Sequence, residues 1–188
     1  MRYGFKAAAE RQSENARKML SLGRLDPIDP WLYCKALGIV VLSFDELPLA
    51  EHHRDRLLSV DPESWSGLTL KEGERHFVVV NPAHSLGRQA NTLVHEVSHV
   101  QLGHVAGRVD ISDSGLMLLS DYPDDQEQEA DWLAGAILIP RDALLLHRRQ
   151  GWSETQIAEH FGTSVPLTQW RLRMTGVDTQ LRRSSRSR

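Results

Sequence analysis

The chain has 188 residues, of which 40% are hydrophobic and 25% are charged, and its formal net charge is -3. This composition fits a globular protein with its own core, excludes a largely disordered chain, and gives no general attraction to nucleic acid or to a membrane. Cys34 is the only cysteine, which excludes an internal disulfide and a zinc site built from several thiolates, so we expect a reducing, cytoplasmic location. The longest apolar run, residues 132–140, is about half the roughly 20 residues of a membrane-spanning helix, and no apolar block of signal-peptide length opens the chain.

The first half of the chain predicts helices around a small sheet. Helical spacing indicates helices over residues 5–22 and 31–37, and the apolar run 39–42 indicates a buried strand. Residues 67–70 and 75–80 should form a hairpin around Gly73, giving a small sheet that is mixed or antiparallel. Asn81 then offers an N-cap, ahead of a first-turn proline, for a helix that reaches about Leu102 and stops at Gly103.

The second half predicts more helices. Residues 105–123 have the composition of a loop, interrupted by an apolar patch at 116–119, and we expect a mobile segment near the functional site. Further helices are expected over 124–139, where Pro140 ends the pattern, and over 141–149. A capping box of Ser153 and Gln156 opens a helix that ends near residue 161, and a last helix covers 166–174. Residues 177–188 end in an arginine-rich and serine-rich stretch and should form a disordered basic tail.

The segment His95-Glu96-Val97-Ser98-His99 contains two histidines four residues apart. On a helix they lie within about 40° of each other, so both imidazoles can reach one metal ion. Zinc accepts neutral imidazole, and a catalytic zinc site uses three protein ligands and leaves the fourth position for water. Glu96 lies beside that open position and could accept a proton from the water.

A third ligand is expected from the helix that follows residue 123. On a helical wheel Glu127 borders the apolar face, whereas Glu129 points away from it. Asp131 falls on the same side as Glu127, where its carboxylate could accept a hydrogen bond from the outer nitrogen of a ligating histidine. We therefore expect Glu127 to bind the metal and Asp131 to support it, while Asp124, Asp125 and Glu129 complement the helix dipole.

His104 suggests a site with three histidines, but its spacing from His99 misses the metzincin pattern by one residue. We interpret His104 as a helix-end residue. Tyr122 and His104 are alternative candidates for stabilising an oxyanion.

With these motifs placed, residues 20–175 resemble the ImmA/IrrE family of bacterial zinc metallo-endopeptidases. The resemblance implies an α+β fold with a zincin-like (gluzincin-type) core, in which zinc is held by His95, His99 and Glu127 and Glu96 is the general acid/base. It also implies a protein substrate, a helix-turn-helix repressor of a mobile element or a stress response. The segments that carry it are Leu37-Gly38-Ile39, Val79-Val80-Asn81, Thr92-Leu93-Val94-His95-Glu96, residues 127–131, Ala134 and Leu138-Ile139-Pro140.

The expected organisation is a zinc peptidase domain over residues 1–150, a helix-turn-helix-like segment over 151–176 and the tail over 177–188. We expect the middle segment to pack on the core. The competing hypothesis is a DNA-binding regulator with a structural zinc site, in which Gln169, Arg171 and Arg173 face a phosphate backbone. A structural site normally has four protein ligands, and the three found here favour catalysis.

Overall fold

Helices and short strands alternate along the chain, and the computed structural model describes residues 1–47, 49–112, 115 and 117–186. The α-helices in this part are α1 (Phe5–Met19), α2 (Pro30–Ala36), α3 (Glu51–Asp55), α4 (Leu86–Leu102), α5 (Asp124–Leu138), α6 (Arg141–Arg149), α7 (Glu154–His160), α8 (Val165–Thr175) and α9 (Val177–Arg186). The strands are β1 (Val40–Leu42), β2 (Gly67–Glu72), β3 (Arg75–Val80), β4 (Arg108–Ile111) and β5 (Met117–Ser120). The expected α+β class is confirmed.

The strands form one mixed sheet in the order β1-β3-β2-β5-β4. β1 runs parallel to β3, and the other pairs are antiparallel. The predicted β2–β3 hairpin is confirmed, with Gly73 at φ 57° in its turn. Such a positive φ is the left-handed region that glycine adopts without steric cost.

The loop predicted for residues 105–123 is wrong, because β4 and β5 form a second hairpin there. β5 pairs with β2, placing Leu119 opposite Thr69, and β4 extends the sheet beyond it. This pairing joins segments about fifty residues apart, so local composition did not reveal it. The mobility expected for this stretch falls partly on residues 113, 114 and 116, which lie outside the described residues.

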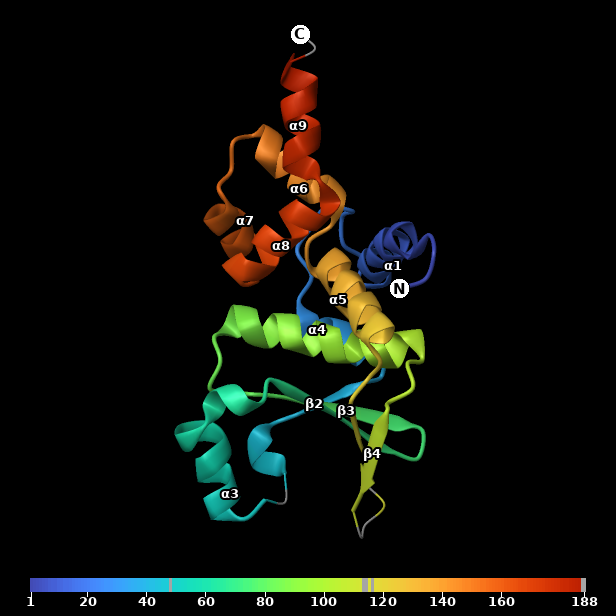
Figure 1. Cartoon of the computed structure of the whole chain (residues 1–188), viewed down its shortest axis with the longest axis vertical. Coiled ribbons are helices and arrows are strands. Elements are labelled where there is room, and N and C mark those ends of the chain that lie inside the picture. Colours follow the sequence, from blue (N-terminus) through green and yellow to red (C-terminus); the bar gives the residue numbers. More distant parts are fainter. Residues whose placement is uncertain (48, 113–114, 116, 187–188) are drawn as a thin grey trace.

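Helix α4 lies between the sheet and the helices α1 and α5 (Figure 1). Leu93, Val94 and Val97 are completely buried in this position. The predicted stop is confirmed, since Gly103 adopts φ 64° and ends the helix. Because α4 is covered on both sides, the polar side chains of Ser98 and His99 are buried as well.

The start of α4 differs from the prediction. Ser85, not Asn81, is the N-cap, and its hydroxyl accepts a hydrogen bond from the Arg88 amide. The Asn81 side chain instead donates to the carbonyls of Pro62 and Trp65. Asn81 therefore holds the segment before β2, which contains Pro62 and Trp65, against the end of β3.

Helix α8 packs closely on α5. A Cβ added at Gly135 would lie 2.6 Å from Cδ of Arg171, so only glycine permits this approach. Arg171 is completely buried, and it donates to Glu10 Oε1 at 2.6 Å and to the Ile139 carbonyl. The expectation that Arg171 faces a phosphate backbone is therefore wrong, whereas Gln169 and Arg173 are exposed.

The disordered tail predicted from residue 177 is corrected, because α9 continues to Arg186. Gly176 ends α8 at φ 68°, which turns the chain so that Val177 is fully buried. Asp178 pairs with Arg148 of α6 at 2.9 Å. These contacts stabilise the helix, and they could not be predicted from the arginine-rich and serine-rich composition. Residues 187–188 lie outside the described part.

Across the described residues, none of the helices combines the length and apolar character needed to cross a bilayer.

Candidate metal centre

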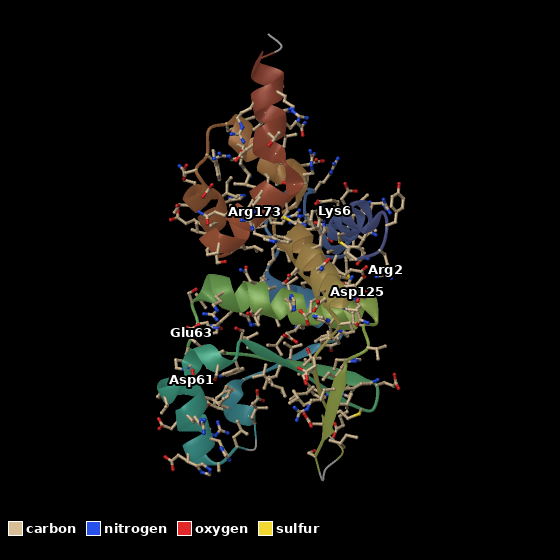
Figure 2. All side chains as sticks on the ribbon, viewed as in Figure 1. Arg2, Lys6, Asp61, Glu63, Asp125 and Arg173 are labelled. Atoms are coloured by element: carbon tan, nitrogen blue, oxygen red, sulfur yellow. The ribbon has the colours of Figure 1, made fainter. Side chains whose placement is uncertain are left out.

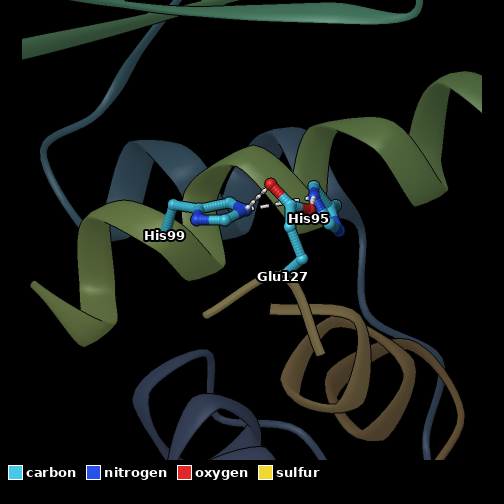
Figure 3. Close-up of side chains that lie close together, drawn as sticks. All are labelled: His95, His99 and Glu127. Carbon is cyan, nitrogen blue, oxygen red and sulfur yellow. Dashed lines mark hydrogen bonds and ion pairs between the residues drawn. The ribbon is translucent and has the colours of Figure 1, made fainter. Parts of the chain in front are cut away.

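Two helices bring three donor groups together. His95 and His99 lie one turn apart on α4, and Glu127 in the first turn of α5 points between them (Figure 3). The two Nε2 atoms are 3.1 Å apart. The Glu127 carboxylate lies 3.2 Å from Nε2 of His95 and 3.6 Å from Nε2 of His99. The three groups that the sequence indicated as ligands thus offer atoms within 4.8 Å of one another.

Burial and neighbouring charges shift the pKa values of the two histidines in opposite directions, so that at neutral pH His95 is protonated and His99 is neutral. Burial alone would lower the pKa of His95, but hydrogen bonds to Asp131 and Glu127 and the charge of Glu96 outweigh it and raise the pKa to about 10. Burial and the positive charge of His95 lower the pKa of His99 to about 4. A metal ion that binds here has to displace the proton of His95.

The outer nitrogens of both imidazoles have partners. Nδ1 of His95 lies 3.0 Å from Oδ1 of Asp131, where the helical wheel placed that carboxylate. Nδ1 of His99 lies 3.0 Å from Nδ1 of His104, which the sequence indicated only as a helix-end residue. Both rings are therefore held with Nε2 directed at Glu127.

The turn after α4 explains how His104 reaches His99. Gly103 donates its amide to Val100 and His104 donates its amide to the His99 carbonyl, the hydrogen-bond pattern of a Schellman motif. The left-handed conformation of Gly103 turns the chain back along the helix. The side chain of His104 is consequently almost completely buried, at 5% exposure.

The orientation predicted for Glu129 is wrong. Its side chain is only 3% exposed, and it pairs with the guanidinium of Arg2 at 2.5 Å. The helical-wheel prediction was based on the apolar residues of α5 alone. In the structure, the N-terminal segment and α1 also cover α5 and widen its buried face. Glu127, in contrast, has a side chain that is 42% exposed and borders open space.

Glu96 lies on the sheet side of α4. Thr69 in β2 donates its hydroxyl hydrogen to Oε2 of Glu96 at 2.5 Å, and burial raises the pKa of this glutamate. A Cβ added at Gly67 would lie 2.5 Å from Thr92, which shows how closely β2 approaches α4. No local pattern in the sequence indicates Thr69, because the contact depends on the packing of the strand against the helix.

A comparison with protein families covers both helices that carry the three donor groups. Residues 34–173, well over half of the chain, match the model of the peptidase M78 family, described as the IrrE N-terminal-like domain. The chain belongs to the peptidase M78 family. The resemblance to the ImmA/IrrE family is thereby confirmed, and a comparison with curated proteins finds no match.

Tyr122 packs against one of the proposed ligands of this M78 site. Its ring stacks on His99 with centroids 3.8 Å apart. Burial, with the negative charges of Glu96 and Glu127, raises the pKa of Tyr122 to about 12, so its hydroxyl keeps its proton at neutral pH. A neutral hydroxyl is a hydrogen-bond donor, the property needed in the oxyanion role considered for Tyr122.

A cavity of about 480 Å³ opens beside His95 and Glu96. Its lining combines polar side chains of α4 with apolar side chains of α5 and α8. The lining includes Gly67, Asn91, Thr92, Asp131, Leu138, Leu167 and Trp170. Helix α8 of this M78 domain therefore forms part of the cleft next to the candidate metal site.

The donor set fits zinc. Two imidazole nitrogens and one carboxylate are a common ligand set of catalytic zinc, and three such donors leave room for water. Asp131 is the usual kind of support for a ligating histidine, and His104 occupies the same position at His99.

Proposed function

We propose that this protein is a zinc-dependent endopeptidase with a zincin-like core of the gluzincin type. The observation that carries the proposal is the convergence of Nε2 of His95, Nε2 of His99 and the Glu127 carboxylate within 4.8 Å. The membership of the chain in the peptidase M78 family supports the same reaction.

In this proposal His95, His99 and Glu127 hold the ion. Bound zinc would supply a Lewis acid that lowers the pKa of water and polarises a peptide carbonyl. Glu96 takes the proton of the attacking water and returns it to the leaving amine nitrogen. The hydroxyl of Thr69 fixes the carboxylate of Glu96, and burial makes that carboxylate a stronger base than an exposed glutamate.

The substrate class follows from the family. We propose a partner protein, and as the ImmA/IrrE resemblance implies, a helix-turn-helix repressor that controls a mobile element or a stress response. An extended peptide needs a cleft with polar and apolar walls, which the 480 Å³ cavity offers. A cytoplasmic setting belongs to this proposal, and the single cysteine, Cys34, is a buried free thiol.

The alternative, a DNA-binding regulator with a structural zinc site, has less support. A structural site is closed by a fourth protein ligand, whereas the cluster found among the described residues offers three donors. Arg171, one of three side chains considered for phosphate contacts, is buried against Glu10. The α7–α8 pair retains helix-turn-helix proportions, but one face of α8 is covered by the protein core.

Substitution of Glu96 by Gln tests the proposal. The amide keeps the size of the side chain and can still accept a hydrogen bond from Thr69, but it cannot accept the proton at neutral pH. We expect one zinc per chain to remain and hydrolysis of a helix-turn-helix repressor encoded beside the protein to fall about 10²- to 10⁴-fold. Zinc is measured by emission spectroscopy and cleavage by gel electrophoresis.

Glu159→Gln is the matched control, because Glu159 is exposed on α7 and distant in sequence from the site. It should leave zinc and hydrolysis unchanged. Loss of zinc from Glu96→Gln would make Glu96 a ligand and refute the mechanism. Full hydrolysis by Glu96→Gln would refute the peptidase proposal.

A further inference from the structure

A series of polar side chains leads away from His99 on the side opposite the cleft, and it is buried as far as Glu129. His99 contacts His104, with 3.0 Å between their Nδ1 atoms, and Nε2 of His104 lies 3.6 Å from Oε2 of Glu129. Glu129 accepts hydrogen bonds from the amide of Arg2 at 2.6 Å and from its guanidinium at 2.5 Å. Figure 2 labels Arg2 beside Asp125, at the start of α5. The series joins three segments that are far apart in the sequence.

The proton positions along this series are determined by what a metal ligand requires. His99 can bind an ion through Nε2 only if its proton resides on Nδ1. That Nδ1–H faces Nδ1 of His104, which must then accept it, so the proton of His104 resides on Nε2. The Nε2–H of His104 points toward the Glu129 carboxylate.

Arg2 fixes the Glu129 carboxylate as the acceptor at the outer end of the series. The amide and the guanidinium of Arg2 both donate to the Glu129 carboxylate, which accepts from them. Glu129 is therefore an acceptor on both sides: Arg2 donates to it from the outside, and Nε2 of His104 faces it at 3.6 Å from the inside. A reversed series would put a proton on Nε2 of His99 and block metal binding.

We infer that His104 is a positioning residue, which fixes the ring and the tautomer of His99 for metal binding, and that Glu129 and Arg2 hold His104 in turn. This inference rests on the proposed zinc site. His104 is not itself a ligand, because it contacts His99 through the outer nitrogen, away from the three inward donors.

The experiment measures the zinc dissociation constant of purified full-length variants by competition with a chelator. His104→Phe keeps a planar ring but offers no acceptor to His99, leaving a buried N–H without a partner. We expect zinc to bind about 10- to 100-fold more weakly, the usual cost of removing such a partner. Circular dichroism establishes that the variant is folded.

Two further variants separate positioning from packing. The amide oxygen of His104→Asn can occupy the place of Nδ1, whereas the longer side chain of His104→Gln places its amide near Nε2. We expect His104→Asn to restore most of the zinc affinity and His104→Gln to restore little. Equal affinities of these two variants, or wild-type affinity of a folded His104→Phe, would overturn the inference.

Arg2→Ala tests the outer end of the series without opening the core, because the Arg2 side chain is 63% exposed. We expect a loss of zinc affinity of less than about tenfold, smaller than that of His104→Phe. Arg11→Ala, which removes an exposed arginine of α1, is the matched control and should have no effect. Unchanged affinity in Arg2→Ala would remove Arg2 from the inference.

These outcomes are distinct from a failure of the proposed function. If the wild-type protein binds no zinc, the proposed function fails. If the wild-type protein binds zinc and Glu96→Gln stops hydrolysis, while folded His104→Phe binds zinc normally, the positioning inference alone fails.

Discussion

The outer nitrogens of His95 and His99 are supported in different ways, one beside the cleft and the other in the interior. The outer nitrogen of His95 faces Asp131, whose side chain is 58% exposed beside the cleft. His99 is supported by His104 and Glu129, whose side chains are 5% and 3% exposed. Water can replace a lost partner on the open side but not in the interior, where an unsatisfied N–H keeps its full cost. The buried side therefore needs a complete polar series, whereas one carboxylate is enough at the cleft.

The largest effects are expected from removing the histidines themselves. His95→Ala and His99→Ala should both reduce bound zinc to background, because two protein ligands hold the ion too weakly. His99→Ala should in addition destabilise the metal-free protein, on the order of 2 kcal/mol or more, since His99 is buried and stacked on Tyr122. Emission spectroscopy and urea denaturation provide the two measurements.

His95→Ala leaves a smaller void, because the His95 side chain is 23% exposed, but it also removes the ion pairs of His95 with Glu127 and Asp131. The two variants are therefore compared near pH 10, where those ion pairs are being lost. Equal destabilisation by the two substitutions would show that the two sides of the site do not differ in packing. Retention of zinc by either variant would remove that histidine from the ligand set.

The next effect concerns pH and the metal-free protein. The pKa of His95 is raised from 6.5 to about 10, so its ion pairs contribute fully below pH 6.5 and are lost as the pH rises toward 10. The pKa of His99 is lowered from 6.5 to about 4, so its contribution is present above pH 6.5 and is lost as the pH falls toward 4. We expect the alkaline decrease in the free energy of unfolding to be on the order of a few kcal/mol.

Urea denaturation of chelator-treated protein between pH 5 and pH 10 measures this dependence. His95→Gln removes the titrating imidazole and should flatten the alkaline part of the profile. Because the positive charge of His95 also lowers the pKa of His99, the acidic decrease should become smaller as well. An alkaline decrease that persists undiminished in His95→Gln would have to come from another group.

The open side of the site could be predicted from the sequence, and the buried side could not. The spacing of His95 and His99 and the wheel position of Glu127 and Asp131 are properties of two single helices, and the structure brings these four side chains together. His104 reaches His99 only because Gly103 turns the chain back. Arg2 and Glu129 meet across 127 positions of the chain, a contact that no local periodicity encodes.

The same distinction holds for the fold. The capping box of Ser153 and Gln156 and the turn at Gly73 are local signals, and both predictions are confirmed. The β4–β5 hairpin depends on pairing with β2, and α9 depends on burying Val177 against the other helices. Those elements obtain their stability from tertiary contacts, so loop-like or low-complexity composition was a misleading guide.

The smallest effect is expected from Asp131→Asn, on the open side. The amide oxygen can still accept a hydrogen bond from Nδ1 of His95, so the orientation of the ring is kept and only the negative charge is lost. Because water reaches Asp131, we expect zinc affinity to fall less than about tenfold, clearly less than in His104→Phe. The same chelator competition measures both variants under one set of conditions. If Asp131→Asn costs as much affinity as His104→Phe, burial is not what separates the two sides, and the carboxylate charge supports His95 more strongly than its exposure indicates.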